Sequence, residues 1–236
     1  MNIQDEFIAT VSHEMRTPLT SIRGFSQTLL SSWDKLDEES KKKFVKIIEE
    51  QSNRLINLVE NILTVSKLNS DKPILRAVNA NSSIEKVLPL LVQKYPKHNF
   101  IKNYDKNLPP ARIDDEKFQQ IITNLLDNGG KYSEEGKNIY ITTASKDNSI
   151  TVKVRDEGVG IPQNDLDKIF EKFTRLENHL TSKTQGNGLG LYITKTLVEA
   201  MNGTINVTSK EGQGTEFELK FPVYNEEEAL KCSLQS

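Results

Sequence analysis

Residues 5–30 read DEFIATVSHEMRTPLTSIRGFSQTLL, and this stretch decides the architecture of the first part of the chain. Its apolar residues recur every three or four positions, which is the pattern of one face of an amphipathic helix. A polar stretch over residues 31–40 interrupts the pattern, and a second stripe follows. We therefore expect two long helices joined by a short loop, with the stripes Phe7, Val11, Met15, Leu19, Ile22, Phe25 and Leu29, then Phe44, Ile47, Ile48, Leu55, Leu58, Ile62, Val65 and Leu68.

A helical hairpin of this kind has an apolar face that needs a partner. Two helices alone bury little surface, and pairing with a second copy is the simplest way to cover that face. The pattern thus predicts a homodimer through residues 5–68, in the form of a four-helix bundle.

Composition narrows the functional classes. The chain has 236 residues, 31 Lys plus Arg against 33 Asp plus Glu, a net charge of -2 and a pI of about 6.0, which argues against a nucleic-acid partner. A lone cysteine, Cys232, excludes an internal disulfide framework and suits a reducing compartment. We find no signal peptide and no apolar run long enough to span a membrane, so we expect a cytoplasmic chain with no direct membrane contact.

After residues 69–73 the pattern changes to mixed strands and helices. We predict an α+β chain: domain 1–70 is the helical hairpin, domain 74–224 is an α/β sandwich with helices on one face of a mixed sheet, and 225–236 is a tail. The expected strands cover residues 74–78, 99–103, 139–144, 150–155, 204–208 and 215–221, and the expected helices cover about 82–93, 114–131 and 189–201. Lys146-Asp147-Asn148 indicates a hairpin turn.

His13 lies nearly opposite the first apolar stripe and is therefore expected to be exposed. Thr17 lies one turn further on the same side, Glu14 is on the flank, and Pro18 should bend or loosen the helix. From periodicity alone, the simplest interpretation is a solvated surface histidine. A metal site is not indicated, because His98 and His179 fall in other predicted elements.

The second half carries separated strings of polar and glycine residues. Asn124 and Asn128 are one turn apart on a predicted helix, and a carboxamide oxygen suits Mg²⁺ that also holds phosphate. Asp156 ends a predicted strand before Gly158 and Gly160. Glycines at residues 186–190 precede a helix N-terminus, where backbone donors favour anions. Taken singly, each string is most simply explained as an ordinary helix surface or loop. The glycine string does not follow a strand and lacks Gly-Lys-Ser/Thr, so neither a Rossmann site nor a Walker P-loop is indicated.

Taken together, the order and spacing of these strings match the pattern of a known family. Ser12-His13-Glu14-Met15-Arg16-Thr17-Pro18-Leu19 resembles the phosphoacceptor motif of sensor histidine kinases of two-component systems. The later strings resemble, in order, the boxes of the ATPase domain shared by histidine kinases, gyrase B, Hsp90 and MutL. The resemblance covers roughly residues 5–223.

The resemblance implies ATP-dependent autophosphorylation of His13, followed by transfer to an aspartate in the receiver domain of a response regulator. Glu14 would orient or deprotonate the imidazole, and Thr17 would help to dephosphorylate the regulator. Asn128 would ligate Mg²⁺, Asn124 and Lys131 would approach the phosphates, and Tyr132 would line the site. The other implied cofactor-binding residues are Asp156 for the adenine amino group, Gly158 and Gly160 around adenine, Phe173, Arg175, Gly186, Gly188, Leu189 and Gly190 around a lid at 176–185, and Thr215 behind the adenine pocket.

One departure from the family pattern is Gly129-Gly130, where a small residue and then an apolar one are usual. Each glycine costs a helix roughly 0.5–1 kcal/mol relative to alanine. We expect a missing apolar contact at Gly130, unless another element approaches the backbone there. If the pair abolishes nucleotide binding, the alternative function is a weak or inactive dimeric signalling scaffold. A gyrase- or Hsp90-like clamp would not need the exposed His13. The short N-terminus suggests the cytoplasmic part of a membrane-bound receptor.

Overall fold

The structure, a computed structural model, describes residues 3–67, 72–174 and 186–226, with side chains described from residue 8. The described residues form two compact units, which we call the helical unit (3–67) and the sheet unit (72–174 and 188–226). Several predicted features lie outside the described part: the Phe7 side chain, Leu68, the break at 69–71, Arg175, the segment 176–185 and the tail from residue 227.

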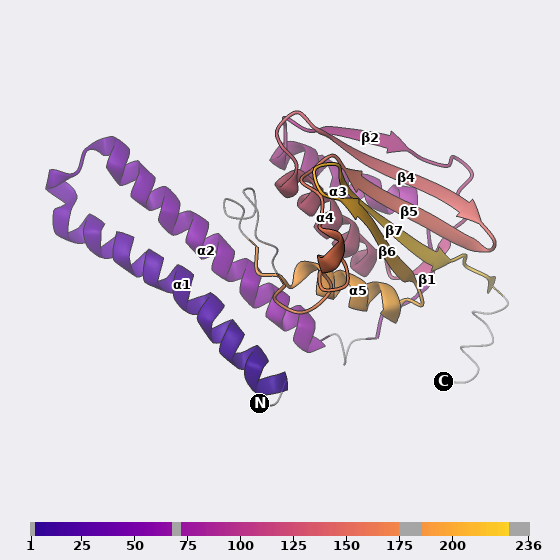
Figure 1. Ribbon diagram of the computed structural model, residues 1–236, viewed down its shortest axis with the longest axis horizontal. Helices are drawn as coiled ribbons and strands as arrows, with labels where there is room; N and C mark the ends of the chain where they lie inside the picture. The colour runs from indigo at the N-terminus through magenta and orange to yellow at the C-terminus, as the bar shows by residue number, and fades with distance from the viewer. Residues whose placement is uncertain (1–2, 68–71, 175–185, 227–236) are drawn as a thin grey trace. The chain divides into compact units, whose positions relative to one another are not determined.

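The helical unit is an antiparallel hairpin of α1 (Ile3–Ser32) and α2 (Glu38–Lys67), joined by the short 3-10 helix η1 (Trp33–Lys35) (Figure 1). Pro18 lies inside α1 without ending it. The second helix begins within the polar stretch expected to be a loop, because Asp37 caps it: the Ser40 amide donates to Asp37 Oδ1 at 2.7 Å.

The predicted stripes meet inside the hairpin rather than forming only an outer face. Leu29 and Leu58 are buried within one chain, and the rings of Phe25 and Phe44 lie 5.1 Å apart. Leu19, expected on the inward stripe, is instead 48% exposed. A further apolar row remains exposed on α2, made of Val45, Ile56, Val59 and Leu63. Leu58 is therefore covered within one chain, whereas these four residues of α2 are not.

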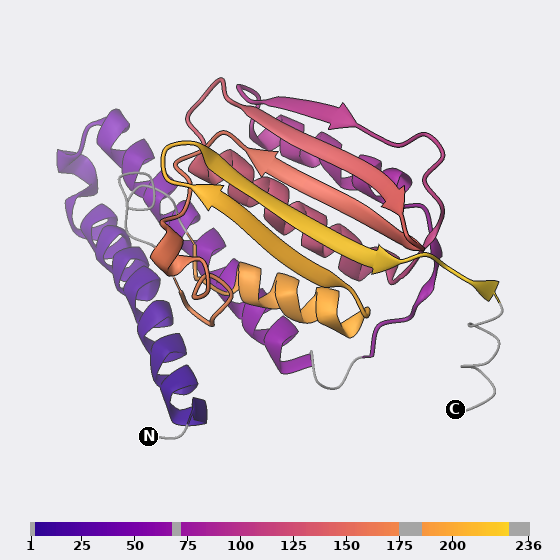
Figure 2. The ribbon, with the colours of Figure 1, turned by 45° about the vertical axis from the view of Figure 1, so that its right-hand side comes forward.

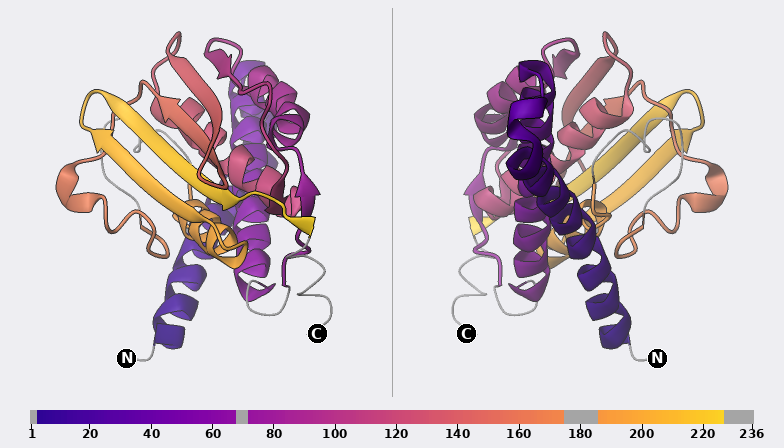
Figure 3. Two further views of the ribbon diagram at one scale, coloured as in Figure 1. Left: turned by 90° about the vertical axis from the view of Figure 1, so that its right-hand side faces the viewer. Right: turned by 90° about the vertical axis from the view of Figure 1, so that its left-hand side faces the viewer.

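The sheet unit has two layers (Figures 2 and 3). Its five-stranded sheet has the order β2 (Asn99–Asn103), β4 (Asn138–Lys146), β5 (Ser149–Asp156), β7 (Gly214–Pro222), β6 (Thr204–Lys210). Only the β2–β4 pair among these is parallel. Helices α3 (Ala80–Lys94), α4 (Asp115–Tyr132) and α5 (Gly190–Ala200) cover one face, as expected.

The hairpin predicted at Lys146-Asp147-Asn148 is confirmed. Lys146 pairs with Ser149, and the two residues between them have φ of 51° and 57°. A two-residue turn needs positive φ at both positions to match the twist of the strands, and Asp and Asn tolerate it.

The structure differs from the predicted elements at the start of the sheet unit. A separate two-stranded ladder pairs β1 (Arg76–Val78) with β3 (Ala111–Ile113). The strand expected at 74–78 is shorter, and β3 was not predicted because three residues after Pro109-Pro110 carry no periodic signal. A 3-10 turn, η2 (Gln163–Asp165), was also not predicted.

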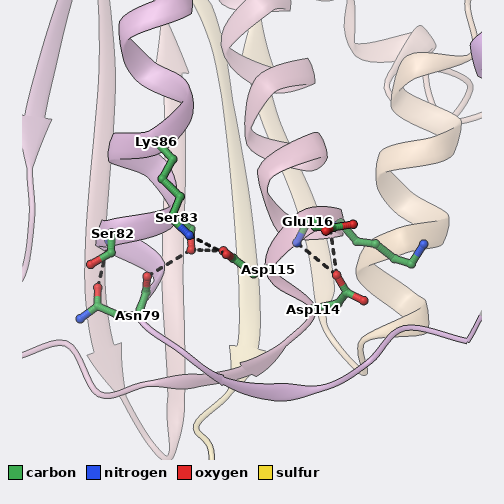
Figure 4. Close-up of polar contacts among 8 residues, drawn as sticks. Asn79, Ser82, Ser83, Lys86, Asp114, Asp115 and Glu116 are labelled. Atoms are coloured by element: carbon green, nitrogen blue, oxygen red, sulfur yellow. Dashed lines mark hydrogen bonds and ion pairs between the residues drawn. The ribbon is translucent and has the colours of Figure 1, made fainter.

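Side-chain caps fix where α3 and α4 begin (Figure 4). The Ser82 amide donates to Asn79 Oδ1 at 3.0 Å, and Asp114 Oδ1 accepts from the amides of Glu116 and Lys117 at 3.1 Å each. Asp115 then links the helices, since it accepts from Ser83 Oγ and, at 2.7 Å, from Lys86 Nζ. These caps satisfy amide groups that a helix N-terminus otherwise leaves unpaired.

The core lies between the sheet and α4. Phe118, Ile121, Ile122, Leu125 and Leu126 of α4 are all fully buried. They pack toward strand residues that alternate between buried and more exposed positions, and Phe118 meets Phe221 edge-on at 5.7 Å between ring centroids. This packing fixes the rotation of α4, so that its polar residues face away from the sheet. Among the described residues, no helix is long and apolar enough to span a membrane.

Candidate functional site

His13 is exposed on α1, as its position opposite the apolar stripe predicts. Thr17 is also exposed, and its hydroxyl donates to the His13 carbonyl at 3.4 Å, whereas Pro18 is buried. Proline has no amide hydrogen, so Pro18 cannot donate the helical hydrogen bond to the backbone carbonyl of Glu14, four residues earlier. The imidazole is therefore accessible on a turn whose backbone ladder is locally weakened.

Glu14 is tied to the second helix of the hairpin. Its Oε2 accepts from Arg54 Nη2 on α2 at 3.1 Å, and both side chains are largely buried, with exposed fractions of 26% and 21%. Arg54 was not singled out from the sequence, because its helical position alone gives no sign of a partner forty residues earlier.

Asp156 lies at the end of β5 with its carboxylate buried. Its Oδ1 accepts from the amides of Gly158 at 2.9 Å and Thr215 at 3.1 Å. Burial raises the pKa of Asp156 to about 6, and the two backbone donors offset only part of that effect. Since both of these bonds go to Oδ1, the second oxygen is left to accept from a ligand.

Gly158 and Gly160 stand where the backbone of other segments comes very close. A Cβ at Gly158 would lie 2.3 Å from the Tyr132 carbonyl oxygen, and one at Gly160, where φ is +69°, would lie 2.1 Å from the Lys210 carbonyl oxygen. Neither position accepts a side chain. The packing of this loop is thus the reason that Gly158 and Gly160 must be glycine.

Ser209, on β6, joins this loop to β7, and no local sequence pattern marks it. The Ile161 amide donates to Ser209 Oγ at 2.8 Å, and that hydroxyl also lies 2.9 Å from Thr215 Oγ1 and from the Gly214 carbonyl oxygen. Thr215 is buried on β7, beside Asp156. The structure therefore brings together two predicted residues that are 59 positions apart.

Along α4, the predicted polar residues differ in what they contact. Asn124 Nδ2 donates to Thr194 Oγ1 of α5 at 2.8 Å, so this carboxamide is not free. Lys131 Nζ lies 2.5 Å from Asp127 Oδ2. Asn128 is half-buried, and its side chain has no hydrogen bond with any residue that the structure describes. The Tyr132 carbonyl accepts from the Val159 amide at 3.0 Å, which joins α4 to the Asp156 loop.

The glycine string leads into α5. Gly186 is described, and Gly188 has φ of +68°, where a Cβ would lie 2.5 Å from the Phe173 carbonyl carbon. Phe173 itself has φ of +62°, so two left-handed residues pack against each other. Leu189 is buried, and a Cβ at Gly190 would lie 2.5 Å from Asn124 Oδ1. Asn124 is therefore held against the first turn of α5 rather than pointing freely from α4.

The gap expected at Gly130 does not exist. A Cβ there would lie 2.7 Å from Tyr95 Cδ2 and Cε2, so the ring of a residue at the end of α3 already fills the space. A Cβ at Gly129 would instead make ordinary contacts of 3.5 Å with Ile139 and 3.6 Å with Asp156. The expectation of a missing contact was wrong at Gly130, because the sequence does not reveal which residue of α3 reaches this position.

Comparison with known families accounts for both units. The family model described as "His Kinase A (phospho-acceptor) domain" matches residues 3–71, and the one described as "Histidine kinase-, DNA gyrase B-, and HSP90-like ATPase" matches residues 113–225. The two lie in the order that the motifs indicate. The chain belongs to the sensor histidine kinases. The resemblance seen in the sequence is confirmed, as is the fold class of a helical hairpin followed by an α/β ATPase unit.

Individual histidine kinases are similar over most of the chain. The sensor protein kinase WalK of Staphylococcus aureus is 36% identical over 222 residues, which are 92% of this chain and 53% of that relative. WalK of strain JH9 has the same identity, with 36% of its length covered. The chain therefore spans about half, or less, of the curated relatives it matches.

Two solved histidine kinases share the fold. Histidine kinase ThkA in complex with response regulator protein TrrA matches with a TM-score of 0.74 and 25% identity, over 93% of this chain and 61% of that one. Full-length ShkA in complex with AMPPNP matches with a TM-score of 0.67 and 28% identity, over 93% of this chain and 46% of that one.

Proposed function

We propose that this chain is the catalytic part of a sensor histidine kinase, which binds ATP, phosphorylates His13 and passes the phosphoryl group to an aspartate of a response regulator. The observation that carries the proposal is the exposed His13, with an acid beside it, in a chain that also has an ATPase unit of the histidine kinase type. A histidine that must meet both ATP and a second protein cannot be buried.

The adenine site is proposed around Asp156. The carboxylate oxygen that the backbone leaves unused would accept from the exocyclic amino group of adenine, and Thr215 would back the ring. Gly158 and Gly160 keep the loop close to the neighbouring backbone, so main chain would form this wall of the proposed adenine site. This supports adenine as the base, since the buried acceptor needs a donor from its ligand.

The phosphates are proposed to lie toward the N-terminus of α5. Gly186, Gly188, Leu189 and Gly190 precede or begin this helix, and the N-terminus of a helix, with its amide groups and its dipole, favours anions. Asn124 would hold this turn against α4 through Thr194, and Lys131 and Tyr132 would face the phosphates from α4. Phe173 and Arg175 are proposed to flank the lid.

Asn128 fits the role of a Mg²⁺ ligand. Its half-buried carboxamide has no hydrogen-bond partner in the described part of the chain, and a carboxamide oxygen is a hard, neutral ligand. Among the described residues, no group of three or more His, Cys, Asp or Glu could hold a metal. Asn128 would be the residue that holds the ion, and Mg²⁺, when bound, would neutralise charge on the phosphates.

The chemistry falls to His13 and Glu14. One imidazole nitrogen would attack the γ-phosphorus, a nitrogen–phosphorus bond would form, and the bond to the bridging oxygen would break, leaving ADP. Glu14 would hold, and then accept, the proton on the other ring nitrogen. Phosphotransfer to the receiver aspartate would follow, and Thr17, exposed one turn away, would position water for dephosphorylation of the regulator. That ThkA forms a complex with TrrA supports a regulator as partner.

A homodimer through residues 5–68 is part of the proposal. The row formed by Val45, Ile56, Val59 and Leu63 is exposed on α2 in a single chain, and an apolar row of this length is a typical contact between helices of a bundle. We also propose domains at 1–70 and 74–224. We further propose that the chain is the cytoplasmic part of a membrane-bound receptor, which its similarity to the sensor kinase WalK supports.

No observation favours the inactive scaffold. Its premise was a defect at Gly129-Gly130, and the Tyr95 ring fills the space at Gly130.

The direct test is incubation with ATP labelled at the γ-phosphate and Mg²⁺. We expect acid-labile, base-stable label on the wild-type chain and none on His13→Gln, with ATP affinity unchanged in that variant. His98→Gln serves as a control and should label normally. Label that persists in His13→Gln, or its absence from the wild type, would refute the proposal.

A further inference from the structure

Tyr95 and Gly130 are matched to each other. The tyrosine is the residue that caps the C-terminus of α3, and its ring lies so close to α4 that only a residue without Cβ fits at 130: the ideal Cβ would be 2.7–2.8 Å from three ring atoms. The ring also lies edge-on to His98, at 5.8 Å between centroids. The glycine thus admits the tyrosine to the flank of the helix that carries the proposed nucleotide residues.

The hydroxyl of Tyr95 ends on Asp127, next to the proposed Mg²⁺ ligand Asn128. It donates to Asp127 Oδ1 at 2.8 Å, and it also lies 3.3 Å from the Asp127 carbonyl oxygen. The other carboxylate oxygen, Oδ2, is 2.5 Å from Lys131 Nζ. Asp127 therefore stands between the tyrosine and the lysine, with one oxygen for each.

Burial, and after it the negative charge of Asp127, raises the pKa of Tyr95, which keeps its hydroxyl a donor. Asp127 in turn accepts from two lysine side chains, Lys94 at Oδ1 and Lys131 at Oδ2, so both of its carboxylate oxygens hold a cation.

Lys94 is a second cation on the same carboxylate, but it is less able to fix it. Its Nζ is 2.5 Å from Asp127 Oδ1, and its side chain is 55% exposed, so the pair is accessible to water and salt. The Tyr95 ring packs against α4 and His98, and both acceptors of its hydroxyl, the carboxylate Oδ1 and the carbonyl oxygen, belong to Asp127. Orientation of the carboxylate therefore rests mainly on the tyrosine.

We propose that Tyr95 is a positioning residue of the nucleotide site, which orients Asp127 and through it sets Lys131 for the phosphates. The inference rests on the proposed function, because it needs Lys131 to face phosphate. Without the hydroxyl, Asp127 Oδ1 would keep only the exposed lysine and the carboxylate would be free to turn. Lys131 would then have to be ordered by the nucleotide itself, at a cost in affinity.

The test compares ATP with adenosine, which has no phosphate. Tyr95→Phe keeps the ring and removes only the hydroxyl. We expect ATP affinity to fall by roughly threefold to tenfold, the effect of one hydrogen bond of typical net strength, and adenosine affinity to stay the same. Both are measured by titration, with an NMR titration for the weaker ligand. Tyr104→Phe, which removes a hydroxyl elsewhere in the sheet unit, is the matched control and should change neither affinity.

A second background isolates the route through the lysine. Lys131→Met should itself weaken ATP binding, and adding Tyr95→Phe to it should cause no further loss. An additional loss in that background would mean that Tyr95 acts by another path and would overturn the proposal.

A second pair of variants covers the case in which Tyr95→Phe alters the fold. Gly130→Ala pushes the ring away from α4 and should weaken the binding of ATP more than that of adenosine. Gly129→Ala, whose Cβ fits, should change the affinity for neither ligand. Equal losses for ATP and adenosine, or no loss in either Tyr95→Phe or Gly130→Ala, would refute the inference. If the wild type binds neither ligand, the proposed function fails instead.

Discussion

Arg54 Nη2 lies 3.1 Å from Glu14 Oε2, so an ion pair joins α1 to α2 beside the proposed phosphoacceptor. The same carboxylate thus has a structural partner and a proposed chemical one, His13. A change at Glu14 alone would confuse the two roles, whereas a change at Arg54 breaks the pair and leaves the acid in place.

The first prediction separates these roles. Glu14→Gln should lower the rate of His13 phosphorylation by about 100-fold or more, the usual range for loss of a general base. Arg54→Gln should lower it far less, although both variants lose the ion pair and should lose about 1 kcal/mol of stability or less. Phosphorylation rates at saturating ATP and thermal melts of both variants are the measurements. Equal rate losses would assign Glu14 a structural role only.

The second prediction concerns the buried charge of Asp156. Its pKa is raised from 3.8 to about 6 in the folded state, so the folded chain binds this proton more tightly than the unfolded chain. The stabilisation from protonation is complete below about pH 4 and is lost as the pH rises through about 6. Asp156→Asn should therefore raise the free energy of unfolding at pH 8 by up to about 3 kcal/mol, and by less at pH 5.

The same substitution should weaken nucleotide binding, since the carboxamide presents a donor where adenine also donates. Denaturant titrations at the two pH values and adenosine binding at pH 8 test both parts. If the stability gain of the variant does not depend on pH, burial does not destabilise the charged form of this carboxylate.

The third prediction tests the match between Tyr95 and Gly130 as a matter of stability. Gly130→Ile should destabilise the sheet unit by roughly 1–3 kcal/mol, the usual cost of overpacking, and Tyr95→Ala should destabilise it by leaving a cavity. The double variant should be more stable than the sum of the two losses implies. Gly129→Ala should instead stabilise by about 0.5–1 kcal/mol. Additive losses in the double variant, measured by urea unfolding, would exclude the match.

The fourth prediction concerns the dimer. Ile56 and Leu63 are 55% and 53% exposed on α2, so Ile56→Lys with Leu63→Lys should give a monomer without unfolding the hairpin. Leu58 is only 2% exposed within one chain, and a charge there should unfold the hairpin itself. Light scattering and circular dichroism measure the two effects. As a control, Leu90→Lys, at an exposed apolar position of α3, should remain dimeric; a double Lys variant that stays dimeric would place the contact elsewhere.

Sequence periodicity predicted the hairpin and most of the sheet unit because those elements are long or alternate clearly. It missed β3, which has three residues, and it assigned Leu19 to an inward face that one chain leaves exposed. For Leu19, the stripe reports that apolar contact is needed, but not whether the partner is the same chain or another copy.

The site could be predicted where one segment carries the chemistry and not where distant segments meet. Asp156, Gly158 and Gly160 follow one another in the chain, so their string could be quoted from the sequence, and its role as an adenine site stays a prediction that rests on the order of all the strings. Ser209 and Tyr95 reach the site only through the packing of β6 and α3, so no local pattern marks them. The same limit produced the wrong expectation at Gly130: its neighbour is 35 positions earlier.

The close contact of Tyr95 with Gly130 also has a consequence for how such chains diverge. If either single exchange is destabilising, the two positions are not free to drift separately. A lineage leaving this arrangement would first have to accept an unstable intermediate, or gain stability elsewhere to tolerate it. The glycine would then be retained because Tyr95 is present, and it could change only together with that tyrosine.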